Sequence, residues 1–175
     1  MIIRKENKKD FEKIYELVKV AFQTANVSAG TEQELVNDLR NSGKYIPELA
    51  LIAEENGRLI GHIMLTKTHI TQGDEKYETL LLAPISVALE YRNKGIGSNL
   101  VKHSFTLAKS MGYTSVVLVG DPDYYNRFGF KKSSDFGIVY KGIPEEYVLA
   151  CELTKNALID IRGEIASVFY ISTPL

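Results

Sequence analysis

Apolar residues recur at strand and helix spacing from the first residues of the chain. Ile2–Arg4 is typical of a short strand. Asn7 is a favourable helix N-cap, and apolar positions repeat every three or four residues after it, which predicts an amphipathic helix over residues 8–24. Thr31 and Glu34 have the spacing of a capping box, which predicts a second helix beyond them. Its apolar side continues towards Gly43, where we expect the helix to end.

The middle of the chain is typical of a β-hairpin. An apolar run, Leu49–Glu55, ends at Asn56-Gly57, a dipeptide strongly favoured in two-residue hairpin turns. The return strand is predicted over Leu59–Thr71, with Gly61 as a candidate β-bulge. Gly73-Asp74 marks the next turn.

A strand, a helix and a second strand follow. Tyr77–Val87 is a long apolar strand that contains Pro84, which has no backbone N–H, so strand pairing should break near it. Gly95–Met111 has the clearest helical spacing, and Ser115–Val119 is a short buried strand. A unit of this order predicts parallel strands joined by a right-handed crossover.

The last third predicts one helical turn and several short strands. The helical turn is expected at Tyr124–Phe128, and strands are expected near Gly137–Tyr140, Tyr147–Leu153 and Glu164–Tyr170. The pattern predicts an α/β (mixed α+β) fold with a mixed sheet. No linker or repeat interrupts the 175 residues, so we expect a single domain over residues 1–175.

Composition narrows the classes of partner. The formal net charge is −1, from 21 basic and 22 acidic residues, and no block of like charge stands out. We therefore expect neither nucleic acid nor a membrane surface as a partner. The run Lys5–Lys13 is interrupted by Glu6, Asp10 and Glu12, which predicts the solvated face of a helix.

The single cysteine, Cys151, excludes an internal disulfide bond, which fits a reducing compartment. The N-terminal residues show no secretory signal core, and no apolar stretch approaches the ~20 residues of a membrane span. We therefore expect a cytoplasmic location.

The segment Arg92-Asn93-Lys94-Gly95-Ile96-Gly97-Ser98 lies between a predicted strand and a predicted helix. Unpaired N–H groups at a helix N-terminus bind anions, and glycines let the backbone come close to a phosphate. Two basic side chains add positive charge, so a pyrophosphate is the expected ligand.

Other glycine-rich phosphate loops fit this segment less well. A dinucleotide fingerprint requires a third glycine where Leu100 stands, and in a P-loop the lysine follows the glycine instead of preceding it. A plain helix start with two turn glycines is the alternative without a ligand.

Two motifs resemble those of the GNAT superfamily of N-acetyltransferases. Arg92-x-x-Gly95-x-Gly97, after Ile85-Ser86-Val87, resembles the hallmark loop of that superfamily. About 30 residues on, Tyr125-Asn126-Arg127-Phe128-Gly129-Phe130 resembles its Tyr-x-x-x-Gly-Phe element. The segment Thr31-Glu32-Gln33-Glu34-Leu35-Val36 and the chain length are similar to an uncharacterised bacterial branch. Residues 77–131 carry the strong resemblance.

The resemblance implies a twisted mixed sheet flanked by helices, in which the central parallel strands splay apart and acetyl-CoA, the co-substrate, binds between them. The pantetheine arm would pair with the backbone of Ile85–Val87, and Pro84 would disrupt pairing where the sheet opens. The implied cofactor-binding residues are Ile85, Ser86, Val87, Arg92, Asn93, Lys94, Gly95, Ile96, Gly97, Ser98 and Asn126.

The implied reaction is direct attack of a primary amine on the thioester in a ternary complex. Backbone N–H groups near Ile85–Val87 are candidate oxyanion donors. Tyr125 aligns with the tyrosine that protonates the CoA sulfur in many members, and it is the candidate catalytic acid; packing against the CoA arm or the core is the alternative. The general base stays open. Glu32 is a candidate, although a solvated carboxylate at a helix start is the expected role.

The histidines and the cysteine offer little independent chemistry. His62, His69 and His103 lack metal-ligand spacing, so no metal is expected. We expect a structural role for His62 in mid-strand and a solvated position for His103. Cys151 is expected to be a small buried side chain on a late strand.

Three alternative functions and the identity of the acceptor stay open. The chain can be a non-catalytic acyl-CoA-binding sensor, a nucleotide- or phosphate-dependent enzyme, or an interaction protein that uses its ten tyrosines and seven phenylalanines. Dimers are common in the superfamily, which leaves a homodimer open. The acceptor is a small-molecule or peptide amine that the sequence does not identify.

Overall fold

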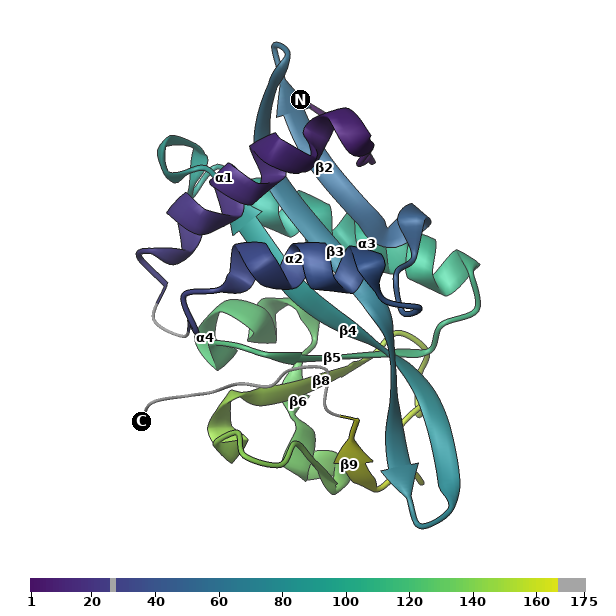
Figure 1. The fold of residues 1–175 in the computed structure, drawn as a ribbon. Coiled ribbons are helices and arrows are strands. Elements are labelled where there is room, and N and C mark those ends of the chain that lie inside the picture. Colours follow the sequence, from purple (N-terminus) through teal and green to yellow (C-terminus); the bar gives the residue numbers. More distant parts are fainter. Residues whose placement is uncertain (26–27, 167–175) are drawn as a thin grey trace. The chain divides into compact units, whose positions relative to one another are not determined.

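The computed structural model describes residues 1–25 and 28–166, and these form two compact units (Figure 1). The first unit contains Met1–Thr66 and Leu82–Leu107, and the second contains Lys67–Leu81 and the chain from Ala108 onward. Strands β3 (Arg58–Gln72) and β4 (Glu75–Val87) pass through both units. In the part of the chain that the structure describes, no helix is long and apolar enough to cross a membrane.

The first unit is a sheet in the order β1-β2-β3-β4 with helices on its faces. β1 pairs antiparallel with β2, and β2 pairs antiparallel with β3. Its remaining elements are β1 (Ile2–Lys5), η1 (Lys8–Asp10), α1 (Phe11–Phe22), α2 (Glu32–Asn41), η2 (Pro47–Leu49), β2 (Ala50–Glu55), η3 (Leu89–Tyr91) and most of α3 (Ile96–Ser110).

Helices α1 and α2 cover one face of this sheet and α3 covers the other (Figure 1). At Gly61 of β3, the Cβ position faces α3. A Cβ added there would come within 3.0 Å of Leu100 Cδ1 and 3.2 Å of Ile96 Cγ2. The missing side chain therefore lets the first turns of α3 approach the sheet closely. His62, the next residue, must point to the opposite face, towards α1 and α2.

The predicted helix starts are correct in position, but only one of the two predicted caps forms. Asn7 Oδ1 accepts a hydrogen bond from Lys9 N at 3.0 Å, and the Asn7 N–H donates to Asp10 Oδ2 at 2.9 Å, which completes a capping box. Thr31 makes no side-chain cap bond, so the capping box predicted for α2 is wrong. Glu32 instead caps the preceding loop, as described below.

The hairpin between β2 and β3 forms where the sequence predicts it. Asn56 and Gly57 both have positive φ angles, 51° and 75°, as this two-residue turn requires. The strand register shifts beside Gly61, because Ala53 pairs with Gly61 and Glu54 with Leu59, which leaves Ile60 as the extra residue. The predicted bulge is therefore displaced by one residue.

The second unit also contains paired strands. Residues 67–72 of β3 and 75–81 of β4 belong to it, and β5 pairs with β8, which pairs in turn with β6. β7 and β9 pair with each other, and β9 also pairs with β3. The elements are β5 (Ser115–Val119), α4 (Pro122–Tyr125), η4 (Asn126–Phe128), β6 (Lys131–Lys132), η5 (Ser133–Phe136), β7 (Ile138–Val139), η6 (Glu145–Tyr147), β8 (Val148–Glu152) and β9 (Gly163–Ile165).

Strand β4 is parallel to β5, as the strand-helix-strand order predicts. The described register has two pairs, Leu80 with Val116 and Leu81 with Val117, whereas β5 pairs with β8 along its whole length. The pairing of β4 with β5 therefore stops before Pro84, in agreement with the prediction. β4 itself continues without a break to Val87.

The predicted fold class is confirmed: the structure is a mixed α/β fold whose sheet is mostly antiparallel and flanked by helices. The sequence did not predict the two-residue strand β6. The strand expected over Glu164–Tyr170 is described only up to Ile165, and its later residues lie outside the described part of the chain. The solvated face expected for Lys5–Lys13 is wrong for two of its acidic residues, Glu6 and Asp10, which are buried.

Candidate active site

The glycine-rich loop ends in a helix N-terminus, as predicted. Asn93 and Gly95 have positive φ angles of 61° and 78°, and the chain turns through them into α3 at Ile96. Asn99 N donates to Gly95 O at 2.9 Å at the start of this helix. N–H groups in the first helical turn have no partner within the helix, and Gly97 adds no side chain in front of them. This geometry can bind an anion.

The two basic residues of the loop lie in different surroundings. Arg92 points to the end of α1, where it donates to Ala21 O and to Thr24 Oγ1, each at 2.7 Å. Its charge thus stabilises the carbonyl end of that helix. Lys94 is exposed, and its Nζ lies 4.9 Å from the centre of the Tyr91 ring. Lys94 is therefore the loop cation that remains accessible to a ligand from solvent.

The end of β4 presents the segment predicted to bind the pantetheine arm. Ile85 and Val87 are half-buried and Ser86 between them is buried. Ser86 Oγ has no hydrogen-bond partner among the described residues. Ala88 N donates to Ile60 O at 2.9 Å, which fixes this end of β4 against β3. The segment and the glycine-rich loop belong to the first unit.

Tyr125 and Asn126, the remaining predicted site residues, belong to the second unit. The Tyr125 ring makes edge contacts with Tyr124 and Phe130, with centroids 4.9 and 5.6 Å apart. A Cβ at Gly120 would lie 2.6 Å from Tyr125 Cε2, so the absence of a side chain there makes room for the ring. Burial raises the pKa of the Tyr125 phenol. The phenol is therefore protonated at neutral pH.

No hydrogen bond joins the Tyr125 hydroxyl to another described side chain, whereas its backbone N–H donates to Asp121 O at 3.2 Å. Asp121 also caps α4 by accepting from Asp123 N at 3.0 Å. Asn126 is exposed at the end of this helical turn, and its carbonyl accepts from Gly129 N at 3.1 Å. The turn is therefore held by its backbone, which leaves the Tyr125 hydroxyl free for chemistry.

A buried polar cluster, formed by Glu6, Arg40, Tyr45 and His62, lies between the sheet and α2 in the first unit. Glu6 accepts from Arg40 Nε at 2.7 Å, Arg40 Nη2 at 2.9 Å and the Tyr45 hydroxyl at 3.0 Å. His62 Nε2 lies 3.0 Å from Glu6 Oε2. The side chains of Glu6 and His62 are 0% exposed. We call these four residues the Glu6 cluster.

The electrostatics of the Glu6 cluster fix its protonation. Burial alone would raise the pKa of the Glu6 carboxyl, but the hydrogen bonds and charges of Arg40 and His62 outweigh it and lower this pKa to about 2. Burial lowers the pKa of His62, which is thus neutral at pH 7. The sequence indicated none of Glu6, Arg40 or Tyr45, and the structural role expected for His62 agrees with its bond to Glu6.

Glu32 is not the solvated carboxylate that the sequence predicts. It is buried in the first turn of α2, and its Oε1 accepts from Ser28 Oγ at 2.8 Å and from Ala29 N at 2.6 Å. Its Oε2 is also buried and has no partner among the described residues. One oxygen of Glu32 therefore shapes the loop before α2.

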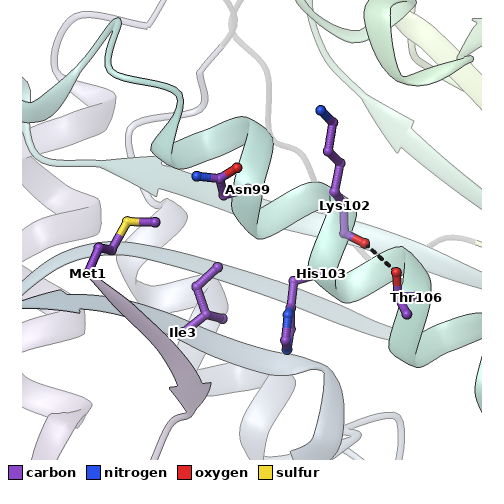
Figure 2. Close-up of a pocket in the computed structure, with 6 residues that line it drawn as sticks. All are labelled: Met1, Ile3, Asn99, Lys102, His103 and Thr106. Atoms are coloured by element: carbon purple, nitrogen blue, oxygen red, sulfur yellow. Dashed lines mark hydrogen bonds between the residues drawn. The ribbon is translucent and has the colours of Figure 1, made fainter.

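Cys151 is a buried residue of β8, as predicted, and burial raises the pKa of its thiol to about 11. An open depression of about 440 Å³ lies beside β1 and the outer side of α3 (Figure 2). Met1, Ile3, Asn99, Lys102, His103 and Thr106 line it. His103 is exposed there, as expected. Among the described residues, no group of three His, Cys, Asp or Glu side chains is placed to hold a metal ion.

Comparison with known proteins assigns this fold and loop to a family. The family model described as the acetyltransferase (GNAT) domain matches residues 2–133. The uncharacterised N-acetyltransferase YhbS of Escherichia coli K12 is 33% identical over 132 residues, which cover 75% of this chain and 74% of YhbS. YjhQ, another uncharacterised N-acetyltransferase of E. coli K12, is 30% identical over 116 residues, or 66% of this chain and 62% of YjhQ. The chain belongs to the GNAT family of acetyltransferases.

Two solved structures agree with this assignment. The E. coli GNAT N-acetyltransferase YhbS in complex with CoA has a TM-score of 0.84 and 28% identity, over 94% of this chain and 87% of that one. A GNAT acetyltransferase from Brucella melitensis in complex with acetyl-CoA has a TM-score of 0.77 and 29% identity, over 95% and 94% of the two chains. The predicted family and enzyme class are confirmed.

Proposed function

We propose that this enzyme transfers the acetyl group of acetyl-CoA to a primary amine, by direct attack of the amine in a ternary complex. The geometry of the glycine-rich loop carries the proposal. Asn93 and Gly95 have positive φ angles and turn the chain into the N-terminus of α3, where unpaired N–H groups can bind an anion. The complexes of the two related acetyltransferases with CoA and acetyl-CoA support it.

The loop and the end of β4 are assigned to acetyl-CoA. Backbone N–H groups of residues 93–98 bind the pyrophosphate, and Lys94 adds charge from the exposed side of the loop. The backbone of Ile85–Val87 pairs with the pantetheine arm, and an N–H group of this segment stabilises the oxyanion. Arg92 contributes indirectly, because it holds the loop to the end of α1.

Tyr125 is assigned as the general acid. The amine nitrogen forms a bond to the thioester carbonyl carbon, the C–S bond breaks, and the Tyr125 hydroxyl gives its proton to the sulfur. The lack of a partner for its hydroxyl among the described side chains supports this role.

The first test is thermal unfolding with matched concentrations of acetyl-CoA, CoA, ATP and NAD. A ligand that binds only the folded protein stabilises it by about 2.7 kcal/mol at a hundred times its dissociation constant. We expect acetyl-CoA and CoA to raise Tm, and ATP and NAD to have little effect. No shift at saturating acetyl-CoA would overturn the proposal.

The second test is an amine panel that follows free thiol release from acetyl-CoA. The panel contains a polyamine, an amino acid, an aminoglycoside, a lysine-containing peptide with a blocked N-terminus and a peptide with a free N-terminus. The only cysteine of the chain is buried, so a thiol reagent reports CoA rather than the protein. Binding of acetyl-CoA without turnover of any amine would contradict catalysis and favour an acyl-CoA sensor.

A further inference from the structure

The Glu6 cluster holds His62 in one tautomer. Glu6 accepts three hydrogen bonds from Arg40 and Tyr45, and its low pKa keeps it a carboxylate, which can only accept. The 3.0 Å contact with His62 therefore requires the proton on Nε2. Nδ1 is then left with a free lone pair. This is the arrangement by which a carboxylate orients a histidine as a general base.

The Nδ1 atom of His62 is buried and has no partner among the described residues. The bond to Glu6 that ties β3 to the chain after β1 uses Nε2 alone. Buried polar atoms without a partner are uncommon, and they call for an explanation such as a catalytic role. A purely structural role for His62 gives no reason for an unpaired lone pair at Nδ1.

Ser86 supplies the second observation. Ala88 N donates to Ile60 O, and the position of a Cβ at Gly61 would be 3.4 Å from Ser86 O, so these parts of β3 and β4 are adjacent. Two residues beyond the Ile60–Ala88 bond, the antiparallel register puts Ser86 opposite His62 with both side chains on one face. Ser86 Oγ is also buried and without a partner among the described residues, so it does not bond to His62 Nδ1 in this structure, and the relay requires their contact to form in the complex with substrate.

Ser86 is the middle residue of the β4 segment that the proposed function assigns to the acetyl-CoA arm. On that assignment, a proton acceptor is needed beside this segment, because the attacking amine must lose a proton as the amide forms. Glu6, Arg40 and Tyr45 are the titratable or charged groups that face His62, from the chain after β1, from α2 and from the loop after α2. None of them is an alternative acceptor of the amine proton. Arg40 and Tyr45 are donors to Glu6, and the Glu6 carboxylate already accepts hydrogen bonds from its donors.

We propose that His62 is the general base of the acetyl transfer and that Ser86 relays the proton to it. As the C–N bond forms, the amine proton passes to Ser86 Oγ and the Ser86 proton passes to His62 Nδ1. The C–S bond breaks, and the sulfur takes the proton of the Tyr125 phenol. Imidazolium and phenolate then return to their starting states by exchange of one proton with solvent. This inference rests on the proposed function.

The test compares His62→Gln and Ser86→Ala with the wild type, using the amine from the panel that gives the fastest thiol release. Glutamine can still donate to Glu6 but cannot act as a base. We expect His62→Gln to lower kcat/KM about a hundredfold or more at pH 7.5, with the dissociation constant of acetyl-CoA unchanged. Ser86→Ala should lower it in the same direction.

The pH profile separates a base from a merely structural residue. In the wild type, log kcat/KM should fall more steeply, by about one extra unit of slope, below the pKa of His62, which lies under its ordinary value of 6.5. This extra slope should be absent in His62→Gln. Two control variants, Thr66→Val on the same strand and His103→Gln on α3, should keep both the rate and the slope.

The outcomes separate the two proposals. No thiol release with any amine contradicts the proposed function and, with it, this inference. Turnover by His62→Gln within about twofold of the wild type, with the extra slope retained, overturns only the role of His62. If His62→Gln does not fold, nitrogen NMR of histidine-labelled wild type decides: a proton on Nδ1 overturns the proposal, and a proton on Nε2 together with the loss of rate in Ser86→Ala supports it.

Discussion

The ring of Tyr125 occupies the space in which Gly120 would otherwise carry a side chain, since a Cβ at Gly120 would lie only 2.6 Å from Tyr125 Cε2. Gly120 follows β5 directly, and its N–H donates to Tyr147 O at 2.9 Å, so its backbone cannot easily move away. The position of the candidate acid is therefore set by a glycine outside the two recognised motifs.

Gly120→Ala should displace the Tyr125 ring. Overpacking of this kind costs about 1–3 kcal/mol, which lowers Tm by roughly 2–4 °C per kcal/mol in a chain of this size. We also expect a larger loss of kcat than of acetyl-CoA affinity. The control is Gly43→Ala, because a Cβ at Gly43 meets no atom within 4 Å. Equal activity in both variants would contradict the link between Gly120 and Tyr125.

Tyr125→Phe tests the acid directly. The substitution removes a hydroxyl that bonds to no other described side chain, so folding stability should change little. The rate of thiol release should fall about a hundredfold at saturating substrates, while acetyl-CoA still binds. Tyr124→Phe, one residue away, is the matched control and should keep the rate.

The pH dependence of the wild-type rate gives a further check on Tyr125. An acid must be protonated to act, and burial raises the pKa of this phenol above its ordinary value of 10. No loss of kcat from ionisation of Tyr125 should therefore appear between pH 7 and 10. A loss in that range that disappears in Tyr125→Phe would contradict the raised pKa.

Much of the fold could be predicted because its signals are local. The Asn56-Gly57 turn and the spacing of β4, α3 and β5 depend on neighbouring residues, and the structure places these elements as expected. The glycine-rich loop could be predicted for the same reason. The sequence could not show which charged side chains would be paired with residues far away in the chain.

The Glu6 cluster illustrates this limit. Its hydrogen bonds join Glu6 to residues 34, 39 and 56 positions away, so no spacing rule could reveal it. Charged residues near a helix start are usually solvated, and the hydrogen bonds with Arg40, Tyr45 and His62 explain why Glu6 is buried. Glu32 departs from the prediction for a similar reason, because its carboxylate turns back to the loop instead of facing solvent.

The low pKa of Glu6 predicts a window of acid sensitivity. The pKa falls from 4.5 to about 2 on folding, so the stabilisation is complete above pH 4.5 and is lost as the pH falls towards 2. The difference corresponds to about 3 kcal/mol. We expect the free energy of unfolding, measured in urea, to fall by at least this amount across the window in the wild type, because the pKa of Asp10 is also lowered.

Glu6→Gln should remove that part of the pH dependence. At pH 7 it should also be less stable than the wild type by about 3–5 kcal/mol, because Arg40 is left buried without its carboxylate. Glu12→Gln, on the exposed side of α1, is the control and should keep the wild-type slope. An unchanged slope in Glu6→Gln would show that other carboxylates cause the acid sensitivity.

The two basic residues of the glycine-rich loop should have separable effects. Arg92 donates to Ala21 O and Thr24 Oγ1, so Arg92→Gln should lower the stability of the ligand-free protein by about 1–3 kcal/mol. Lys94 is exposed and contacts the Tyr91 ring, so Lys94→Gln should leave that stability nearly unchanged. Its charge should act on the bound CoA instead. We expect the CoA dissociation constant to rise up to about fivefold, which corresponds to one exposed ion pair.

Calorimetric titration of CoA at low and high salt distinguishes the two residues, because an exposed charge is screened by salt. Lys94→Gln should weaken the salt dependence of CoA binding, whereas Arg92→Gln should retain most of it. If Arg92→Gln abolished the salt dependence and left the ligand-free protein as stable as the wild type, Arg92 would have to leave α1 and bind the phosphates itself. The bonds to Ala21 and Thr24 would then not persist in the CoA complex.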